Sequence, residues 1–141
     1  MSATEIFFIA GLIAGGIALV SILVNKSGRG NALLAASLSA GFGAFTAVQI
    51  WQEGAEMFWT NHTQNLTGTQ VWWDLIICAM VALFFAAPRA RKQGMNVPLW
   101  ALFVGCTASI GLLAMVARLF WLENAEAAAG AKPTAKPATA S

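Results

Sequence analysis

The 141-residue chain offers few side chains that could do chemistry, because only 10% of its residues are charged and it contains a single histidine. One histidine cannot supply a bis-histidine haem site or a histidine-rich metal site. Glu53 and Glu56 precede His62 closely enough to join it around a metal ion, but solvated polar residues of a connecting loop are the favoured interpretation. Glycine-rich phosphate loops and serine, histidine and acid sets are also missing. The sequence therefore predicts no catalytic residue, no metal and no cofactor, while leaving room for a bound lipid or other lipophilic molecule.

Asp74 and Arg118 are the most informative charged residues, since each falls about one helical turn inside an apolar stretch. A charged side chain at that depth is costly unless it pairs or faces the interior of a helical bundle. If the two stretches are antiparallel neighbours, both side chains lie at a similar depth. The pair is then either a structural clamp or the polar element of a binding or transport site, and both interpretations predict contact.

Cys78 and Cys106 are not expected to form a disulfide. With Asp74 and Arg118 level, the two sulfurs differ in depth by about 12 Å at roughly 1.5 Å per helical residue. A disulfide needs Cα atoms within about 7 Å of each other. Both cysteines are interpreted as buried apolar thiols, and they form no CxxC redox motif.

The composition excludes a soluble enzyme. Apolar residues make up 58% of the chain, and charged residues make up 10% against about 25% in soluble proteins. A small domain has no core large enough to hide so many apolar side chains. The charges lie mostly near the ends of long apolar runs, which a lipid bilayer would solvate. The chain is therefore predicted to be an integral membrane protein.

Four apolar runs predict an all-α membrane protein whose four transmembrane helices form two antiparallel hairpins. The runs cover residues 5–24, 31–52, 71–88 and 97–122. Each is close to the roughly 20 residues needed to cross about 30 Å of hydrocarbon. Their continuous apolar character does not fit the alternating pattern of a strand barrel. Residues 123–141, rich in Ala, Lys, Pro and Thr, are predicted to form a disordered tail, with a short helical extension through Ala129 as the alternative for its start.

Basic residues set the predicted orientation. Lys26 and Arg29 lie in the first connection and Arg89, Arg91 and Lys92 in the third, whereas the second connection has no Lys or Arg. The positive-inside rule then places connections one and three in the cytoplasm and predicts that both termini are extracytoplasmic. No cleavable signal peptide is evident, because no basic residue precedes the first apolar run. Short turns and alanine-rich helices favour a bacterial inner membrane.

The tryptophans fall near the predicted membrane boundaries. Anchoring at the interface is the favoured interpretation, and a role in ligand binding is the alternative. Trp100 is predicted at the inner boundary. Those predicted at the outer boundary are Trp51, Trp59, Trp72, Trp73 and Trp121.

Small residues line the first two predicted helices. Gly11 and Gly15 form a GxxxG motif in the first, and Ser39 and Gly43 keep the same spacing in the second. Such spacing lets helix backbones approach closely in lipid. Packing of the first hairpin onto itself is the favoured interpretation, and recruitment of another membrane subunit is the alternative.

From about residue 31 to 122 the chain resembles a family of short bacterial integral membrane proteins that is known only as a domain of unknown function. The similar features are Phe58-Trp-Thr-Asn61, Trp73-Asp-Leu75, Ala90-Arg-Lys-Gln-Gly-Met95, and Gly111-Leu112 followed by Arg118. Arg89 stands where that family commonly has an acidic residue, and Leu113 where it has a proline. The resemblance implies the helical membrane architecture and the Asp74 and Arg118 pair without implying an activity, and the first helix is an addition to it.

Two classes of function follow. The favoured one is a non-catalytic accessory or scaffold subunit of a larger membrane complex, with membrane lipids, other membrane subunits or a second copy as partners and no nucleic acid. The alternative is a small transporter or membrane enzyme that handles a lipophilic molecule at the outer leaflet through Asp74 and Arg118. Small-residue helix faces and the missing catalytic sets lead us to favour the first class.

Overall fold

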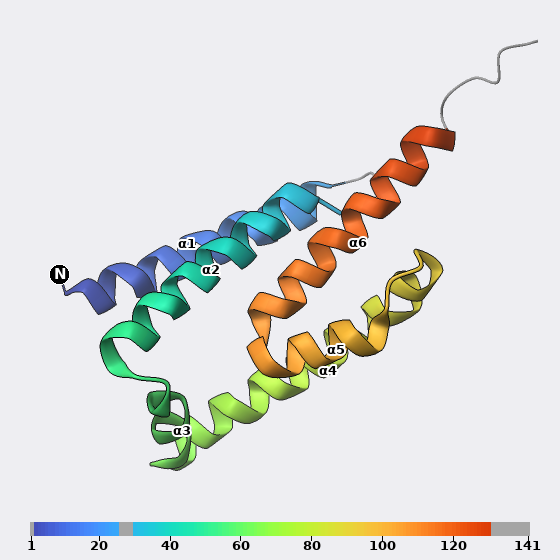
Figure 1. Ribbon diagram of the computed structural model, residues 1–141. Helices are drawn as coiled ribbons and strands as arrows, with labels where there is room; N and C mark the ends of the chain where they lie inside the picture. The colour runs from blue at the N-terminus through green and yellow to red at the C-terminus, as the bar shows by residue number, and fades with distance from the viewer. Residues whose placement is uncertain (1, 26–29, 131–141) are drawn as a thin grey trace, which may run out of the picture.

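The computed structural model describes residues 2–25 and 30–130, which form helices and short connections without a strand (Figure 1). The prediction of an all-α protein is confirmed within these residues. Residues 123–130 of the predicted disordered tail are helical, and residues 131–141 lie outside the described part of the chain, as do Lys26 and Arg29. The helices are α1 (Ala3–Val24), α2 (Ala32–Glu53), α3 (Glu56–Thr63), α4 (Leu66–Lys92), α5 (Val97–Thr107) and α6 (Ser109–Gly130).

Within the described residues, three helices are long and apolar enough to cross a membrane, which is consistent with an integral membrane protein. They are Thr4–Val24 within α1, the whole of α2 and the whole of α4. α4 is longer than the predicted span 71–88, because Asn65 caps its first turn by accepting a hydrogen bond from the Gly68 N–H at 2.7 Å. The helix also continues through Pro88 to Lys92. The preceding connection, expected to be a loop, contains α3.

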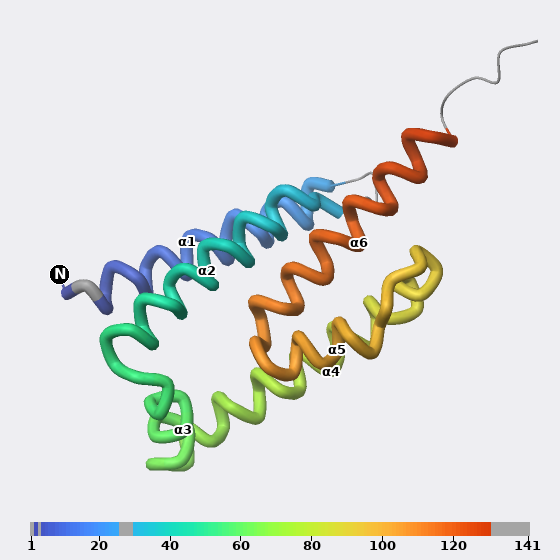
Figure 2. The backbone as a smooth tube through the Cα atoms, in the orientation of Figure 1, coloured from blue at the N-terminus to red at the C-terminus, as the bar shows by residue number. Residues whose placement is uncertain are grey.

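The predicted fourth span is broken into two helices at Ala108. This residue has a φ of 49° and a ψ of −118°, a backbone conformation that residues with a side chain rarely adopt. Its N–H donates to the Val104 carbonyl oxygen at 2.6 Å and ends α5. The chain then folds back, so that α6 runs in the opposite direction beside α5 (Figure 2). The prediction of two long hairpins is therefore wrong at this point.

Gly111 makes the close reversal sterically possible. A Cβ atom at this position would lie 2.6 Å from the Thr107 Oγ1 atom and 2.9 Å from the Phe103 carbonyl oxygen. Both distances are shorter than ordinary contacts, and the second involves backbone that cannot rotate away. The first turn of α6 can therefore lie against the last turn of α5 only with glycine here.

α6 packs against α2 on one side and against α4 and α5 on the other. Ser39 Oγ in α2 donates to the Ile110 carbonyl oxygen at 2.9 Å, and a Cβ at Gly43 would be 3.7 Å from the Ile110 side chain. On the opposite side of α6, the buried core is formed by Ala86, Ala90, Val97, Met115 and Leu119. The small face of α2 is thus used for helix packing, but against α6 and not against α1.

The two ends of the described chain lie at opposite ends of the helix bundle (Figure 1). Ser2 caps the far end of α1. The last turns of α6 lie beside the end of α4 and the start of α2, since Glu126 accepts a hydrogen bond from Gln93 at 2.7 Å and Asn124 donates one to the Gly30 carbonyl oxygen at 3.1 Å. Four full spans would have put both chain ends on one side. The break at Ala108 reverses the last helix and prevents this.

The close contact of Gly111 in the turn between α5 and α6 leads to a prediction about stability. Gly111→Ala should lower the free energy of unfolding by about 1–3 kcal/mol, because the added methyl group overlaps the Phe103 carbonyl oxygen. Gly105→Ala is the matched control. It lies in α5 with open space around its Cβ position, so alanine should stabilise the helix by about 0.5–1 kcal/mol. Thermal unfolding in detergent measures both changes, and losses of similar size would show that the reversal at Ala108 is not the native fold.

Candidate functional site

The two ends of the bundle carry opposite charge. The acidic end comprises the start of α1, the end of α2, α3 and the first turns of α4 (Figure 1). It contains Glu5, Glu53, Glu56 and Asp74. The basic end comprises the other ends of α1, α2 and α4, the start of α5 and the end of α6. It contains Arg89, Arg91, Lys92, Glu123 and Glu126.

An ion pair joins α4 to α6 at the basic end. Arg89 Nε donates to Glu123 Oε1 at 2.9 Å and Nη2 donates to Oε2 at 2.6 Å, the two-pronged geometry that carboxylates and guanidinium groups prefer. The Arg89 guanidinium also lies 5.6 Å from the centre of the Phe120 ring. Together with the Gln93 to Glu126 hydrogen bond, this pair aligns the end of α4 with the end of α6.

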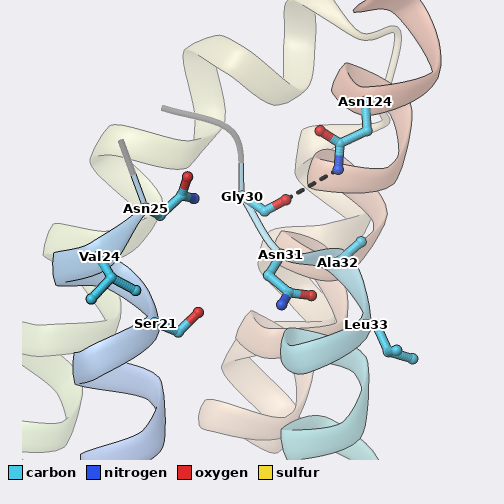
Figure 3. A pocket seen from close by; sticks show the side chains of 8 residues that line it. All are labelled: Ser21, Val24, Asn25, Gly30, Asn31, Ala32, Leu33 and Asn124. Atoms are coloured by element: carbon cyan, nitrogen blue, oxygen red, sulfur yellow. Dashed lines mark hydrogen bonds between the residues drawn. The ribbon is translucent and has the colours of Figure 1, made fainter. Parts of the chain in front are cut away.

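A polar cavity of about 540 Å³ opens beside this ion pair, between the ends of α1, α2 and α6 (Figure 3). Its polar side chains are Ser21, Asn25, Asn31 and Asn124. An apolar cavity of about 400 Å³ continues from it between α1, α2 and α6 and reaches Arg89. Hydroxyl and amide groups could bind the polar part of a lipid, but they contain no nucleophile paired with a base and so suit no obvious catalysis.

Asp74 and Arg118 do not meet. Asp74 is exposed, and its Oδ1 atom lies 4.0 Å from the Cys78 thiol, one turn further along α4. The Arg118 guanidinium lies over the Trp121 ring, 4.5 Å from its centre. The predicted contact is therefore wrong.

The reversal at Ala108 is the reason that the depth argument failed. Arg118 lies five residues before Glu123, and Asp74 lies fifteen residues before Arg89. At about 1.5 Å per residue, they are roughly 7 Å and 22 Å from the ion pair along their helices. The useful signal was the complementary charge of Arg89 and Glu123, which four full spans would have placed on opposite sides.

Four tryptophans lie at the acidic end, and two lie at the basic end. Trp100 is at the predicted end and packs against the buried core. Trp121 lies at the opposite end from the other tryptophans with which it was grouped. It is two residues before Glu123 and therefore belongs to the basic end. Trp51, Trp59, Trp72 and Trp73 share one end of the bundle, and their role as anchors at the membrane interface stays a prediction.

Gly11 and Gly15 face open space. A Cβ atom at either position would have no neighbour within 4 Å, so these glycines do not pack α1 onto α2 as predicted. The two helices meet through Phe7 and Phe45, whose ring centres are 5.0 Å apart. The reason is that α6 occupies the small face of α2 around Ser39. Cys78 and Cys106 are both free thiols, but both are exposed, so the prediction that they are buried is wrong.

A third cavity, of about 270 Å³, lies at the acidic end between α3 and α4. Three aromatic side chains line it, Phe58, Trp59 and Trp72, together with Ala55, His62 and Thr63. His62 is within this wall, its Nδ1 atom 2.5 Å from the Phe58 carbonyl oxygen. Within residues 2–25 and 30–130, no group of three His, Cys, Asp or Glu side chains is placed to hold a metal ion, so Glu53, Glu56 and His62 do not form such a group.

Comparison with protein-family models, with curated proteins and with solved structures finds no match to this chain. Function must therefore be inferred from the geometry of the chain itself.

Two double-mutant cycles test the charge arrangement. Arg89→Gln and Glu123→Gln should show a coupling of about 1 kcal/mol, near the upper limit for pairs that remain partly exposed, because their contact has two hydrogen bonds. Asp74→Asn and Arg118→Gln form the matched cycle, and their effects should add within about 0.5 kcal/mol because these residues do not touch. The measurement is thermal unfolding in detergent. Coupling in the second cycle and additivity in the first would support four full spans instead.

Proposed function

We propose that the chain is a small polytopic protein of the bacterial inner membrane that acts as a non-catalytic accessory or scaffold subunit of a larger membrane complex. The observation that carries this proposal is that α1 is not packed into the core of the chain. Its span Thr4–Val24 contributes no buried residue to the chain's own core, and its ring contact with α2 is the Phe7 and Phe45 pair.

An unpacked apolar helix with a glycine face suits a partner helix. Gly11 and Gly15 lie one turn apart on the same face of α1, with open space beside both. In lipid, helices associate through close backbone contact at such small residues. A subunit whose own core is made by α2, α4, α5 and α6 can therefore use α1 to join another membrane protein.

The proposed membrane arrangement has α1, α2 and α4 as full spans, with α5 and α6 entering from the basic end. The 11 residues of α5 reach about 16 Å at roughly 1.5 Å per residue, about half of the hydrocarbon thickness. Irregular backbone at this depth is tolerated where protein covers it, and Ser39 provides a hydrogen bond there. The positive-inside rule puts the basic end in the cytoplasm, so Ser2 is extracytoplasmic and the end of α6 is cytoplasmic, which revises our expectation of two extracytoplasmic termini.

Cysteine labelling tests this arrangement. In a variant with Cys78→Ala and Cys106→Ala, the substitution Ser2→Cys should react with a membrane-impermeant maleimide in intact cells. Ala128→Cys, on an exposed turn of α6, should react only after the membrane is opened. Labelling of both positions in intact cells would restore four spans and overturn the proposed reversal.

The alternative function, a transporter or membrane enzyme for a lipophilic molecule at the outer leaflet, draws less support from this geometry. It relied on Asp74 and Arg118 acting together, and these residues lie apart. The accessory-subunit proposal needs no such pair.

Co-purification in mild detergent tests the role of α1. A membrane protein in fixed stoichiometry should accompany the wild-type chain and be lost when both Gly11→Leu and Gly15→Leu are introduced, because leucine blocks close backbone approach. Gly16→Leu is the matched control. This glycine also faces open space but points about 100° away from Gly15 around the helix, so the partner should be retained. Isolation of the wild-type chain with no stoichiometric partner and no second copy would refute the proposal.

A further inference from the structure

The cavity between α3 and α4 is lined by aromatic side chains that remain partly exposed to solvent. Phe58, Trp59 and Trp72 line it, and they remain 40%, 76% and 42% exposed. Its volume of about 270 Å³ is just below the roughly 300–1,000 Å³ of sites for drug-sized ligands. The size therefore suits a small group or the headgroup of a larger molecule.

The aromatic walls are held in place by contacts between α3 and α4. Thr69 Oγ1 in α4 donates to the His62 carbonyl oxygen at 3.0 Å. The Asn61 carbonyl comes so close to Gly68 that no Cβ would fit there. The His62 ring lies 5.2 Å from the Trp72 ring. These contacts already hold the two helices together, so a ligand entering the cavity would not have to order the helices that carry the rings.

Charge at this end favours a cation. Glu53 and Glu56 flank the start of α3, and Asp74 follows Trp72 in α4. The sequence has no Lys or Arg from residue 30 to residue 88. The local field is therefore negative, which raises the concentration of cations and repels anions.

The residues that line the cavity determine which type of cation would bind most favourably. Metal ions of the magnesium and calcium kind need carboxylate or carbonyl ligands, and no carboxylate lines this cavity. A primary ammonium group brings three N–H donors that need acceptors. The uncharged lining offers only the lone pairs of the Thr63 hydroxyl and of the Phe58 and Trp59 carbonyl oxygens, which are already engaged with His62 at 2.5 Å and with Thr63 at 2.8 Å. A quaternary ammonium group has no N–H to satisfy and is attracted by aromatic faces, tryptophan most strongly.

We propose that the cavity formed by Phe58, Trp59 and Trp72 binds the quaternary ammonium group of a choline-type molecule. The aromatic rings supply the attraction, the surrounding carboxylates supply the long-range field, and the contacts of Gly68 and Thr69 hold the rings apart. This site is separate from the α1 face on which the proposed subunit role depends.

The primary test compares two ligands of the same shape. Binding of choline and of its uncharged isostere, in which carbon replaces the nitrogen, is measured by equilibrium dialysis with the full chain in a maltoside detergent. Choline should bind at least about tenfold more tightly, because only the cation interacts with the ring quadrupole. Equal binding of the two ligands, or binding of neither, would show that these aromatic residues serve as interfacial anchors only.

Variants locate the site. Trp72→Leu should weaken choline binding about 3- to 30-fold, since it removes one aromatic wall. Trp73→Leu is the matched control, because Trp73 is the exposed neighbour that does not line the cavity. If Trp72→Leu does not fold by circular dichroism, Trp59→Leu replaces it, because that side chain is 76% exposed and contributes little packing. Equal effects of the cavity and control variants would overturn the assignment.

Nanodiscs of different lipids distinguish a lipid headgroup from a free solute as the source of the ammonium group. If the natural occupant is a lipid headgroup, discs of phosphatidylcholine should abolish binding of added choline, whereas discs of phosphatidylglycerol should preserve it. If the occupant is a free solute, added choline should bind in both. Binding in neither disc type nor in detergent would contradict the site altogether.

Discussion

A helix that breaks inside an apolar environment must satisfy the backbone groups that the break exposes, and the turn at Ala108 is where this chain meets that constraint. The Ala108 N–H is satisfied by Val104 within the turn. Ser39 reaches across from α2 to the carbonyl oxygen of Ile110, and Gly111 allows the backbone of α6 to pass close to Phe103. The small residues of α2 therefore do two things at once, because they let α6 approach and provide a hydrogen bond where it begins.

The direction of α6 determines most other contacts in the molecule. Running back from Ala108, it brings Glu123 to Arg89 and Asn124 to Gly30, so the last turns of α6 lie at the basic end, whereas four full spans would have placed them at the acidic end. It also fills the face of α2 that a simple hairpin would have offered to α1. The exposure of α1 is thus a consequence of the turn, because only one helix can occupy the groove beside Ser39.

The sequence predicts the helical class and four long apolar helices, and three of these, α1, α2 and α4, are long helices in the structure. Continuous apolar runs of that length have few other solutions. It does not predict the break, since residues 97–122 are continuously apolar and contain no proline after Pro98. Two features of the sequence are related to the break, Gly111 and the opposite charges of Arg89 and Glu123. Neither one predicts the break unless the direction of α6 is already known. The aromatic cavity could not be predicted from the sequence for a different reason. The tryptophans were visible, but their grouping depends on α3, a helix of 8 residues in a connection that looked like a polar loop.

α4 is the element that connects the two ends. Its first turns hold α3 through Gly68 and Thr69, and its last turns hold α6 through Arg89. About 20 residues separate these contacts, or roughly 30 Å at 1.5 Å per residue, which is close to the hydrocarbon thickness. α1 takes part in neither set of contacts. A protein bound along α1 would therefore leave both the aromatic cavity and the ion pair intact, so a subunit role and an ammonium site can coexist in so short a chain.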